Sequence, residues 1–377
     1  MSQRRITYVS GTRADLGLMQ STLLRLQQAP DLALDLLVTG MHLDDRHGQT
    51  VDDILRAALP IRARVPVPLL PSNGATMAAN IGRMTLAFTE ALAADPPDLL
   101  LLLGDRGEQL AGALAGLHLG LANVHIHGGE RSGTVDEPVR HAVSKLSHYH
   151  CVATEGSRER LLRMGESADS IFVTGAPGLD GLADMPRQSR TALCDTTGID
   201  ATRPVALVLF HPVLQEAATA GRDMQAILDA LQQAGWQAVC LMPNADAGSA
   251  DVRAVIERRR QPGLHVVNHL ARPDFVAWMA CCDAMVGNSS AGIIEAATFA
   301  TPVLNIGSRQ NLRERNDNVA DLPASAEVLA DHLGALPRDS RRRMTNRYGD
   351  GHAGERIEQI LRTVPIGAAL TPKSNAY

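Results

Sequence analysis

The stretch Asp98-Leu-Leu-Leu-Leu-Leu-Gly-Asp-Arg106 determines the fold class. Its run of leucines is far too short to span a membrane and matches a β-strand that is buried on both faces. The run ends at Gly104, and the polar pair Asp105 and Arg106 follows at its carboxyl end. Buried parallel strands that end in polar loops are typical of open α/β sheets, whose ligands bind at that edge.

Short apolar runs alternate with helical patterns on both sides of this stretch. The pattern predicts a parallel, doubly wound sheet, and it occurs twice. The polar stretch 175–204, rich in proline and glycine, separates the halves. We therefore predict an N-terminal domain at 1–175, a C-terminal domain at 176–365 and a flexible tail at 366–377. Two such domains facing each other would leave a ligand cleft at the carboxyl ends of their sheets.

The expected strands and helices follow from the same patterns. Strands are expected at 6–10, 34–39, 98–103, 123–127, 149–154, 171–174, 205–210, 238–242, 265–267, 284–286 and 303–306. Helices are expected, among others, at 16–28, 76–94, 139–147, 219–234 and 291–299.

The composition limits the classes of partner. The chain has 377 residues, 45% of them hydrophobic, which is enough to fill two cores. The formal net charge of −5 argues against nucleic acid or an anionic membrane as the main partner. The five cysteines show no C-x-x-C spacing, which fits a reducing compartment. The N-terminus leads directly into a short strand without a signal-peptide core, so we expect a cytoplasmic protein.

Two loops are candidate anion sites because each joins a predicted strand to a helix. Gly11-Thr-Arg-Ala-Asp15 would present backbone amides and the guanidinium of Arg13 to phosphate oxygens. Gly287-Asn-Ser-Ser-Ala-Gly292 adds two hydroxyls, and Glu295 beyond it could hold a ribose. Each loop can also be explained as a helix N-terminus without a ligand. Neither has the G-x-G-x-x-G or the Walker pattern, so no nicotinamide cofactor or ATP is expected.

Acidic and imidazole groups are concentrated in residues 125–141. The segment contains His125-Ile-His-Gly-Gly-Glu130 and Asp136-Glu-Pro-Val-Arg-His141. His125 and His127 alternate along a strand and are therefore expected on one face. Such a cluster suggests a site that tunes protonation. The histidine spacing matches no common zinc signature, so no metal is expected, and hydrogen-bonded structural histidines are the alternative.

Several further polar residues follow predicted strands. Asp105 could face a ligand there, although an N-cap role for the next helix would also explain it. His42, His211 and Asn244 lie in loops after other strands. On spacing alone, each of these three can also be a plain loop residue.

Together the motifs resemble a known family. The set consists of Gly11-Thr-Arg-Ala-Asp15, Gly104-Asp-Arg106, His125-Ile-His-Gly-Gly-Glu130, Asp136-Glu137 with Arg140-His141, Gly287-Asn-Ser-Ser290 and Asn305-Ile-Gly-Ser-Arg-Gln310. In this order, from about residue 5 to 320, it resembles the hydrolysing UDP-N-acetylglucosamine 2-epimerases. The resemblance implies two Rossmann-like domains of the glycosyltransferase-B type.

The resemblance also implies an activity. The reaction converts UDP-N-acetylglucosamine and water to N-acetylmannosamine and UDP, at the entry to sialic acid synthesis. A close branch acts on N,N′-diacetylbacillosamine linked to UDP or GDP, on the way to legionaminic acid. From the motifs and loop positions together, the predicted catalytic residues are Asp105, Glu130, Asp136, His127 and His42. The predicted substrate-binding residues are Arg13, Arg106, Arg140, His211, Asn244, His269, Ser289, Ser290, Gly292, Glu295 and Arg309.

One position departs from the wider family. Relatives that keep UDP on their product tend to carry Glu at the third position of the His125 motif. Here that residue is His127, and Glu130 follows three residues later, as in the hydrolysing branch. Either residue could transfer the proton, and we favour a shared site in which Glu130 does so.

The chemistry needs acid and base groups but no redox cofactor. A base removes the weakly acidic proton on carbon 2 as UDP departs, and water then adds to the resulting 2-acetamidoglycal. The alternatives are a retaining glycosyltransferase, a non-hydrolysing epimerase and a catalytically idle sugar-nucleotide sensor. The acid/base cluster favours an epimerase over a transferase. We expect a UDP-sugar as partner and a homodimer or homotetramer.

Overall fold

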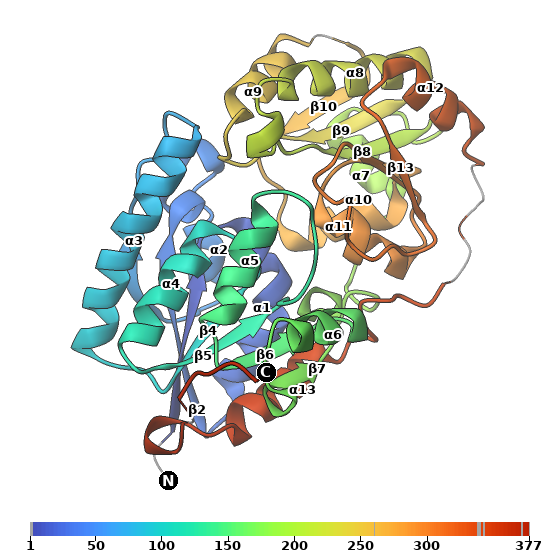
Figure 1. The fold of residues 1–377 in the computed structure, drawn as a ribbon. Coiled ribbons are helices and arrows are strands. Elements are labelled where there is room, and N and C mark those ends of the chain that lie inside the picture. Colours follow the sequence, from blue (N-terminus) through green and yellow to red (C-terminus); the bar gives the residue numbers. More distant parts are fainter. Residues whose placement is uncertain (1–2, 260, 338–340, 342–343, 371, 377) are drawn as a thin grey trace. The chain divides into compact units, whose positions relative to one another are not determined.

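The chain forms two compact units in a computed structural model that describes residues 3–259, 261–337, 341, 344–370 and 372–376 (Figure 1). Unit 1 comprises the residues up to 130, residues 136–180 and those from 348 onward, and unit 2 comprises residues 131–135 and 181–347. The predicted linker 175–204 contains the change of unit after Asp180. The C-terminal limit differs from the prediction, because the chain returns to unit 1 at Tyr348.

Unit 1 is built on a seven-stranded parallel sheet with the strand order β3-β2-β1-β4-β5-β6-β7. Its central strand β4 is the leucine run, and every residue of it is buried. The strands are β1 (Arg4–Ser10), β2 (Leu32–Thr39), β3 (Ile61–Val65), β4 (Leu99–Leu103), β5 (Ala122–Ile126), β6 (Tyr149–Val152) and β7 (Ile171–Val173).

Helices cover both faces of this sheet, as the apolar character of β4 requires. Because side chains alternate along a strand, Leu99 and Leu101 join the core beside α1 and α13, while Leu100 and Leu102 join the core beside α3 and α4. Figure 1 shows α3 and α4 packed side by side. The helices of the unit are α1 (Arg13–Gln28), α2 (Val51–Arg56), α3 (Gly74–Ala94), α4 (Gly107–His118), α5 (Asp136–Lys145), α6 (Glu155–Arg163) and α13 (Ala353–Thr363).

The C-terminal segment belongs to unit 1 because α13 is amphipathic. Its apolar residues Ile357 and Leu361 are fully buried in the core that also contains α1. Beyond α13, the described part of the predicted flexible tail is hydrogen-bonded to the same unit. Lys373 donates to Glu166, and the amide of Ala376 donates to the carbonyl of Gly165 at 2.8 Å.

Unit 2 contains a six-stranded parallel sheet with the order β10-β9-β8-β11-β12-β13. Apolar side chains of α8, α9 and α12 fill the core on one face, and those of α7 and α10 fill the other. The strands are β8 (Val205–Leu209), β9 (Gln237–Leu241), β10 (Leu264–Val267), β11 (Ala284–Gly287), β12 (Val303–Ile306) and β13 (Val319–Leu322). The helices are α7 (Arg190–Thr197), α8 (Ala220–Gln233), α9 (Ser249–Arg258), α10 (Arg272–Cys281), α11 (Ser290–Ile294) and α12 (Ala326–Ala335).

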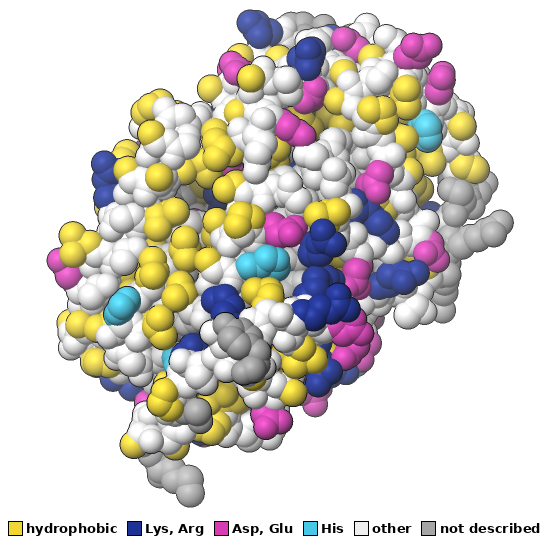
Figure 2. Space-filling model, viewed as in Figure 1, with side chains coloured by type: hydrophobic (Ala, Val, Ile, Leu, Met, Phe, Trp, Pro, Cys, Tyr) yellow, Lys and Arg dark blue, Asp and Glu magenta, His cyan; other side chains and the backbone are white. Residues whose placement is uncertain are grey.

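The surface carries charges of both signs. On the face shown in Figure 2, Lys and Arg side chains lie beside Asp and Glu side chains. Within the described residues, no helix combines the length and the apolar character that crossing a membrane requires.

Candidate active site

The centre of the candidate site in unit 1 is an ion pair between Asp105 and Arg140. Asp105 follows β4, Arg140 lies on α5, and the guanidinium donates to the carboxylate. The side chain of Arg140 is 1% exposed, and it also donates to the backbone carbonyl of Glu130 at 3.1 Å. A buried guanidinium requires such partners. Arg140 therefore ties the loop after β4 to the loop after β5.

Asp136 is the first residue of α5, so the helix that supplies Arg140 also begins at a predicted acid/base residue. Residues four apart on a helix project from the same side. Asp136 and Arg140 are spaced in this way, which brings a second carboxylate to the side of α5 that faces Asp105.

The loop after β5 has an unusual backbone conformation. β5 ends at Ile126, one residue earlier than predicted, and His127 has a φ of +62°. Few residues with a side chain adopt this left-handed conformation. It ends the alternation of the strand, so the prediction that His125 and His127 share a strand face is wrong. Such conformations concentrate at functional sites.

His127 and Glu130 form a buried pair. Nδ1 of His127 is hydrogen-bonded to Oε1 of Glu130, and the two residues are 5% and 3% exposed. Nε2 of His127 is buried and has no hydrogen-bond partner within the described part of the chain. Burying a polar atom without a partner is unfavourable. The pair therefore offers a substrate one unused imidazole nitrogen.

His125 supports the loop that carries Asp105. Its Nε2 lies 2.8 Å from the carbonyl oxygen of Gly104, and its Nδ1 lies 2.9 Å from Oγ of Ser144. Burial lowers the pKa of His125 to about 3, so its ring is neutral near pH 7. A carbonyl can only accept, so Nε2 carries the proton and Nδ1 accepts from Ser144. His125 thus fixes the backbone next to Asp105.

His42 is more deeply placed than the sequence suggests. It lies in a 3₁₀ helix after β2 (Gly40–Leu43) and is fully buried. Its Nε2 lies 2.9 Å from Oγ of Ser10, and its Nδ1 lies 2.7 Å from Oγ1 of Thr50. Burial lowers the pKa of His42 to about 4, although the charge of Glu108 opposes the shift. Both ring nitrogens are therefore engaged within the protein, and the catalytic role of His42 stays a prediction.

The loop between β1 and α1 differs from the expected anion site. Thr12 caps α1, and the carboxylate of Asp15 accepts from the amides of Gly11 and Thr12 at 3.0 and 2.7 Å. These amides, expected to face phosphate, are taken by the protein's own carboxylate. The guanidinium of Arg13 is the group of this loop that suits an anionic ligand.

Glu108 was not identified from the sequence. It lies in the first turn of α4, is 7% exposed, and accepts from Nε of Arg106 at 3.1 Å. A Cβ atom placed on Gly11 would lie 2.4 Å from Oε1 of Glu108, so the carboxylate rests on the Gly11 backbone. An acid in a first helical turn is usually a solvated residue that favours the helix dipole. For that reason its position in the sequence does not distinguish it.

In unit 2, Asn288 connects several predicted nucleotide-binding residues. Its side chain exchanges two 2.8 Å hydrogen bonds with the backbone of His211, and its carbonyl accepts from Arg309 at 3.1 Å. Nδ1 of His211 accepts from the amide of Asn244 at 3.3 Å. An imidazole nitrogen that accepts carries no proton, so Nε2 is the donor of His211.

The loop after β11 leads into the short helix α11. Oγ of Ser289 accepts from the amide of Ala291 at 3.4 Å and so caps the helix, and Ser290 is the first helical residue. A Cβ atom on Gly292 would lie 2.9 Å from Val303 of β12. This contact explains Gly292 by packing of the helix on the sheet, without the predicted contact to substrate.

Glu295 is held at the end of α11 by an ion pair with Arg272 of α10. The carboxylate is 2% exposed, so its burial depends on this partner. His269, the remaining predicted binding residue, lies between β10 and α10. Arg272 is a further residue of this region that was not predicted from the sequence.

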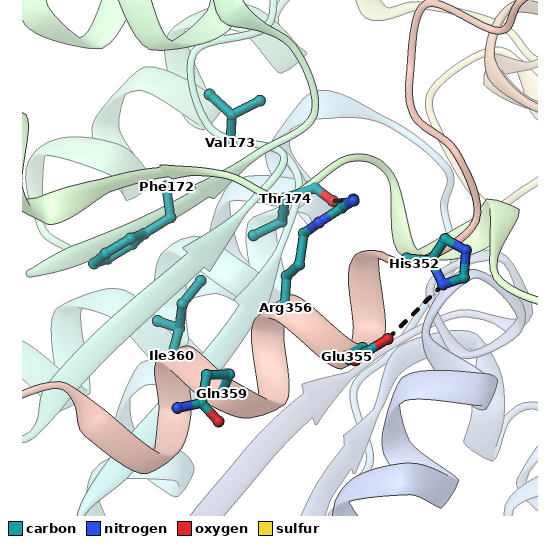
Figure 3. A pocket seen from close by; sticks show the side chains of 8 residues that line it. All are labelled: Phe172, Val173, Thr174, His352, Glu355, Arg356, Gln359 and Ile360. Carbon is teal, nitrogen blue, oxygen red and sulfur yellow. Dashed lines mark hydrogen bonds and ion pairs between the residues drawn. The ribbon is translucent and has the colours of Figure 1, made fainter.

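An open pocket of about 570 Å³ lies at another place in unit 1, beside β7 and α13 (Figure 3). Figure 3 shows Arg356 of α13 directed toward Thr174, whose carbonyl accepts from it at 3.0 Å. None of the predicted site residues lines this pocket. Its lining residues are Phe172, Val173, Thr174, His352, Glu355, Arg356, Gln359 and Ile360.

Among the residues that the structure describes, no group of three or more His, Cys, Asp or Glu side chains is arranged to hold a metal ion. The expectation of a reaction without a metal stays a prediction.

Two parallel α/β units, with carboxylate and imidazole side chains clustered after β4 and β5, define a protein of the glycosyltransferase-B fold type. The family described as UDP-N-acetylglucosamine 2-epimerase matches residues 24–362, and the chain belongs to this family. This result confirms the resemblance, the fold class and the expected class of enzyme.

Individual relatives agree with the family. The chain is 46% identical to the hydrolysing UDP-N,N′-diacetylbacillosamine 2-epimerase of Legionella pneumophila, over 99% of this chain and 100% of that one. It is 33% identical to a UDP-N-acetylglucosamine 2-epimerase of Neisseria meningitidis, over 84% and 83% of the two chains. A crystal structure of a UDP-N-acetylglucosamine 2-epimerase from Neisseria meningitidis, bound to UDP-N-acetylglucosamine, has a TM-score of 0.77 and 19% identity, covering 95% of this chain and 100% of that one.

Proposed function

We propose that this chain is a hydrolysing UDP-N-acetylglucosamine 2-epimerase. It releases UDP from the sugar nucleotide and inverts carbon 2 to give N-acetylmannosamine. The observation that carries this proposal is the buried His127–Glu130 pair. His127 has a left-handed backbone conformation, and its Nε2 makes no hydrogen bond within the described residues. An imidazole hydrogen-bonded to a carboxylate through one ring nitrogen can exchange a proton with a substrate through the other.

The reaction requires proton transfer on two faces of the sugar. In the first step the bond from carbon 2 to hydrogen and the bond from carbon 1 to UDP both break, which gives a 2-acetamidoglycal. In the second step water adds its oxygen to carbon 1, and a proton reaches carbon 2 from the opposite face. Asp105 and the His127–Glu130 pair are two separate acid/base groups, as this sequence of steps demands.

Asp136 supplies a further carboxylate for these steps, and Arg140 fixes the position of Asp105. The buried guanidinium holds the Asp105 carboxylate in one place through the ion pair. Positioning of this kind is valuable because a base must lie within hydrogen-bond reach of the proton it removes.

We assign binding of the diphosphate and nucleoside to the remaining predicted residues. Cationic and hydroxyl groups stabilise the charge on the departing UDP. The donors are Arg13, Arg106, His211, Ser289, Ser290 and Arg309. Glu295 and the loop of His269 would hold the ribose and the base.

A second sugar is favoured by a specific observation. The relative from Legionella pneumophila, with 46% identity over nearly the whole chain, is named for UDP-N,N′-diacetylbacillosamine. That sugar also carries an acetamido group at carbon 2, so the same elimination and hydration steps would apply to it. The two substrates differ at carbons 4 and 6, away from the reacting bonds.

The test is incubation of the enzyme with each UDP-sugar, followed by identification of the released sugar by NMR. Release of UDP together with a free 2-epimerised sugar supports the proposal, and the better substrate is the one with the higher kcat/KM. A product that keeps UDP would indicate a non-hydrolysing epimerase. Transfer of the sugar to an acceptor without epimerisation would indicate a transferase.

We extend the proposal to the cellular setting. The product suits the synthesis of sialic or legionaminic acid, and a cytoplasmic homodimer or homotetramer without a metal or redox cofactor is expected. Size-exclusion chromatography with light scattering tests the oligomeric state.

A further inference from the structure

Glu108 joins the two arginine-containing loops of unit 1. Its carboxylate accepts from Nε of Arg106 at 3.1 Å and rests on the backbone of Gly11, two residues before Arg13. The side chain of Glu108 is only 10% exposed. The helix dipole favours a carboxylate in the first turn even when that carboxylate is exposed to solvent. The helix therefore does not explain why the Glu108 carboxylate is buried, and burial of a charge is unfavourable.

We propose that Glu108 is a positioning residue that orients Arg106 toward the diphosphate of the sugar nucleotide, an inference that rests on the proposed function. A guanidinium has five N–H donors in one plane. A bond through Nε fixes that plane and uses one of the five. Contact with Gly11 on one side prevents the carboxylate from following Arg106 into other rotamers. The arginine is therefore ordered before the substrate arrives, which lowers the entropic cost of binding.

Substitution of Glu108 separates orientation from charge. Glu108→Ala removes the acceptor, and we expect the Kd for UDP to rise about tenfold, the loss of one charge-assisted hydrogen bond. Glu108→Gln keeps an oxygen acceptor and should restore affinity to within about threefold of wild type. In turnover assays, Glu108→Ala should raise KM more than it lowers kcat. Calorimetry with UDP and steady-state kinetics give these values.

Gly11→Ala tests the contact from the other side. Gly11 does not have a positive φ, and the atoms nearest to an added Cβ belong to Glu108, whose carboxylate must move to admit alanine. We expect Gly11→Ala to weaken UDP binding as Glu108→Ala does. The double variant should bind UDP no more weakly than Glu108→Ala alone, because both substitutions disrupt the same interaction of Glu108. Glu90→Ala removes an exposed carboxylate from α3 and serves as the matched control.

The outcomes distinguish this inference from the proposed function. Wild-type affinity for UDP in Glu108→Ala, or additive losses of UDP affinity in the double variant, would overturn the role of Glu108 and leave the proposed function unaffected. A merely structural role would lower the melting temperature of Glu108→Ala and Glu108→Gln alike without a difference in Kd, which also overturns it. Failure of wild-type protein to bind UDP overturns both proposals. Binding of UDP without turnover of either sugar overturns only the proposed reaction.

Discussion

Arg140 is almost completely buried, while its ion-pair partner Asp105 is 20% exposed. The cation is therefore the structural member of the pair, and the carboxylate is the member that a substrate can reach. This asymmetry matches a site in which a fixed positive group holds a reacting carboxylate. It also predicts different consequences for replacing the two residues.

We expect Asp105→Asn to lower kcat by about two to four orders of magnitude, as for the loss of an acid/base group. UDP should still bind. The melting temperature should also fall, because the buried Arg140 loses its charged partner. Asp136→Asn is the comparison for a carboxylate at the start of the same helix as Arg140. Full turnover in either variant would remove that residue from the mechanism.

Turnover in deuterated water should place one deuterium at carbon 2 of the released sugar. The elimination step removes the original proton, and the hydration step delivers a new one from solvent. Mass spectrometry and NMR of the product measure the isotope. A product with only protium at carbon 2 contradicts elimination and favours direct hydrolysis or transfer.

The roles of His127 and Glu130 can be separated by substitution. Both His127→Asn and Glu130→Gln roughly retain shape and hydrogen bonding while removing titration, and we expect Glu130→Gln to cause the greater loss of kcat. A complete loss in His127→Asn combined with full turnover in Glu130→Gln would reverse the assignment. The pH profile of kcat/KM should change in whichever variant lacks the proton-transfer group.

Activity should be unaffected by EDTA and by added nicotinamide cofactor. The reason is the absence of zinc spacing and of a dinucleotide-binding motif in the sequence. Rates measured before and after chelation test the prediction. Loss of activity that a divalent ion restores would show that the enzyme depends on a metal.

The buried histidines should make stability depend on pH. Burial lowers the pKa of His42 to about 4 and that of His125 to about 3, both below the ordinary value of 6.5. As the pH falls below 6.5, the unfolded chain takes up protons that the native state does not, so stability decreases until the folded pKa is reached. Each histidine contributes at most about 1.4 kcal/mol per pH unit.

This dependence can be measured between pH 6.5 and 5, above the range in which most carboxylates titrate. Denaturant unfolding of the wild type and of His42→Gln should give a smaller slope of stability against pH in the variant. An identical slope would show that His42 does not titrate between the two states. The control variant is His118→Gln, which replaces an exposed histidine on α4.

The sequence predicts the buried strands well but misses two of the four edge strands. The leucine run of β4 is found as expected, and β12 (Val303–Ile306) has the predicted bounds. The unpredicted strands β3 and β13 are both edges of their sheets. Their residues are largely half-buried, and β3 alternates apolar and charged side chains, so neither contains the continuous apolar run that marks a central parallel strand.

The site is predictable to the level of its motifs. Asp105 follows a strand as predicted, whereas His127 lies just beyond the strand that was predicted to contain it, and Asp136 begins α5 ahead of the predicted helix start at residue 139. The sequence does not reveal which backbone groups the side chains reach. Asp15 fills an expected anion site through a local capping box with Thr12, whereas Glu108 reaches back to Gly11 because tertiary packing brings separate loops together. The contact between Glu108 and Gly11 requires the fold to be known.

Unit 1 is assembled from the two ends of the chain, because α13 packs with α1 in one core. During synthesis, the first 180 residues therefore leave the ribosome long before the helix that closes their core. The nascent chain exposes the apolar surface that Ile357 and Leu361 later cover until α13 has been translated. A premature stop codon before α13 would consequently damage the unit made first, and chaperone binding to that unit should continue until α13 has been synthesised.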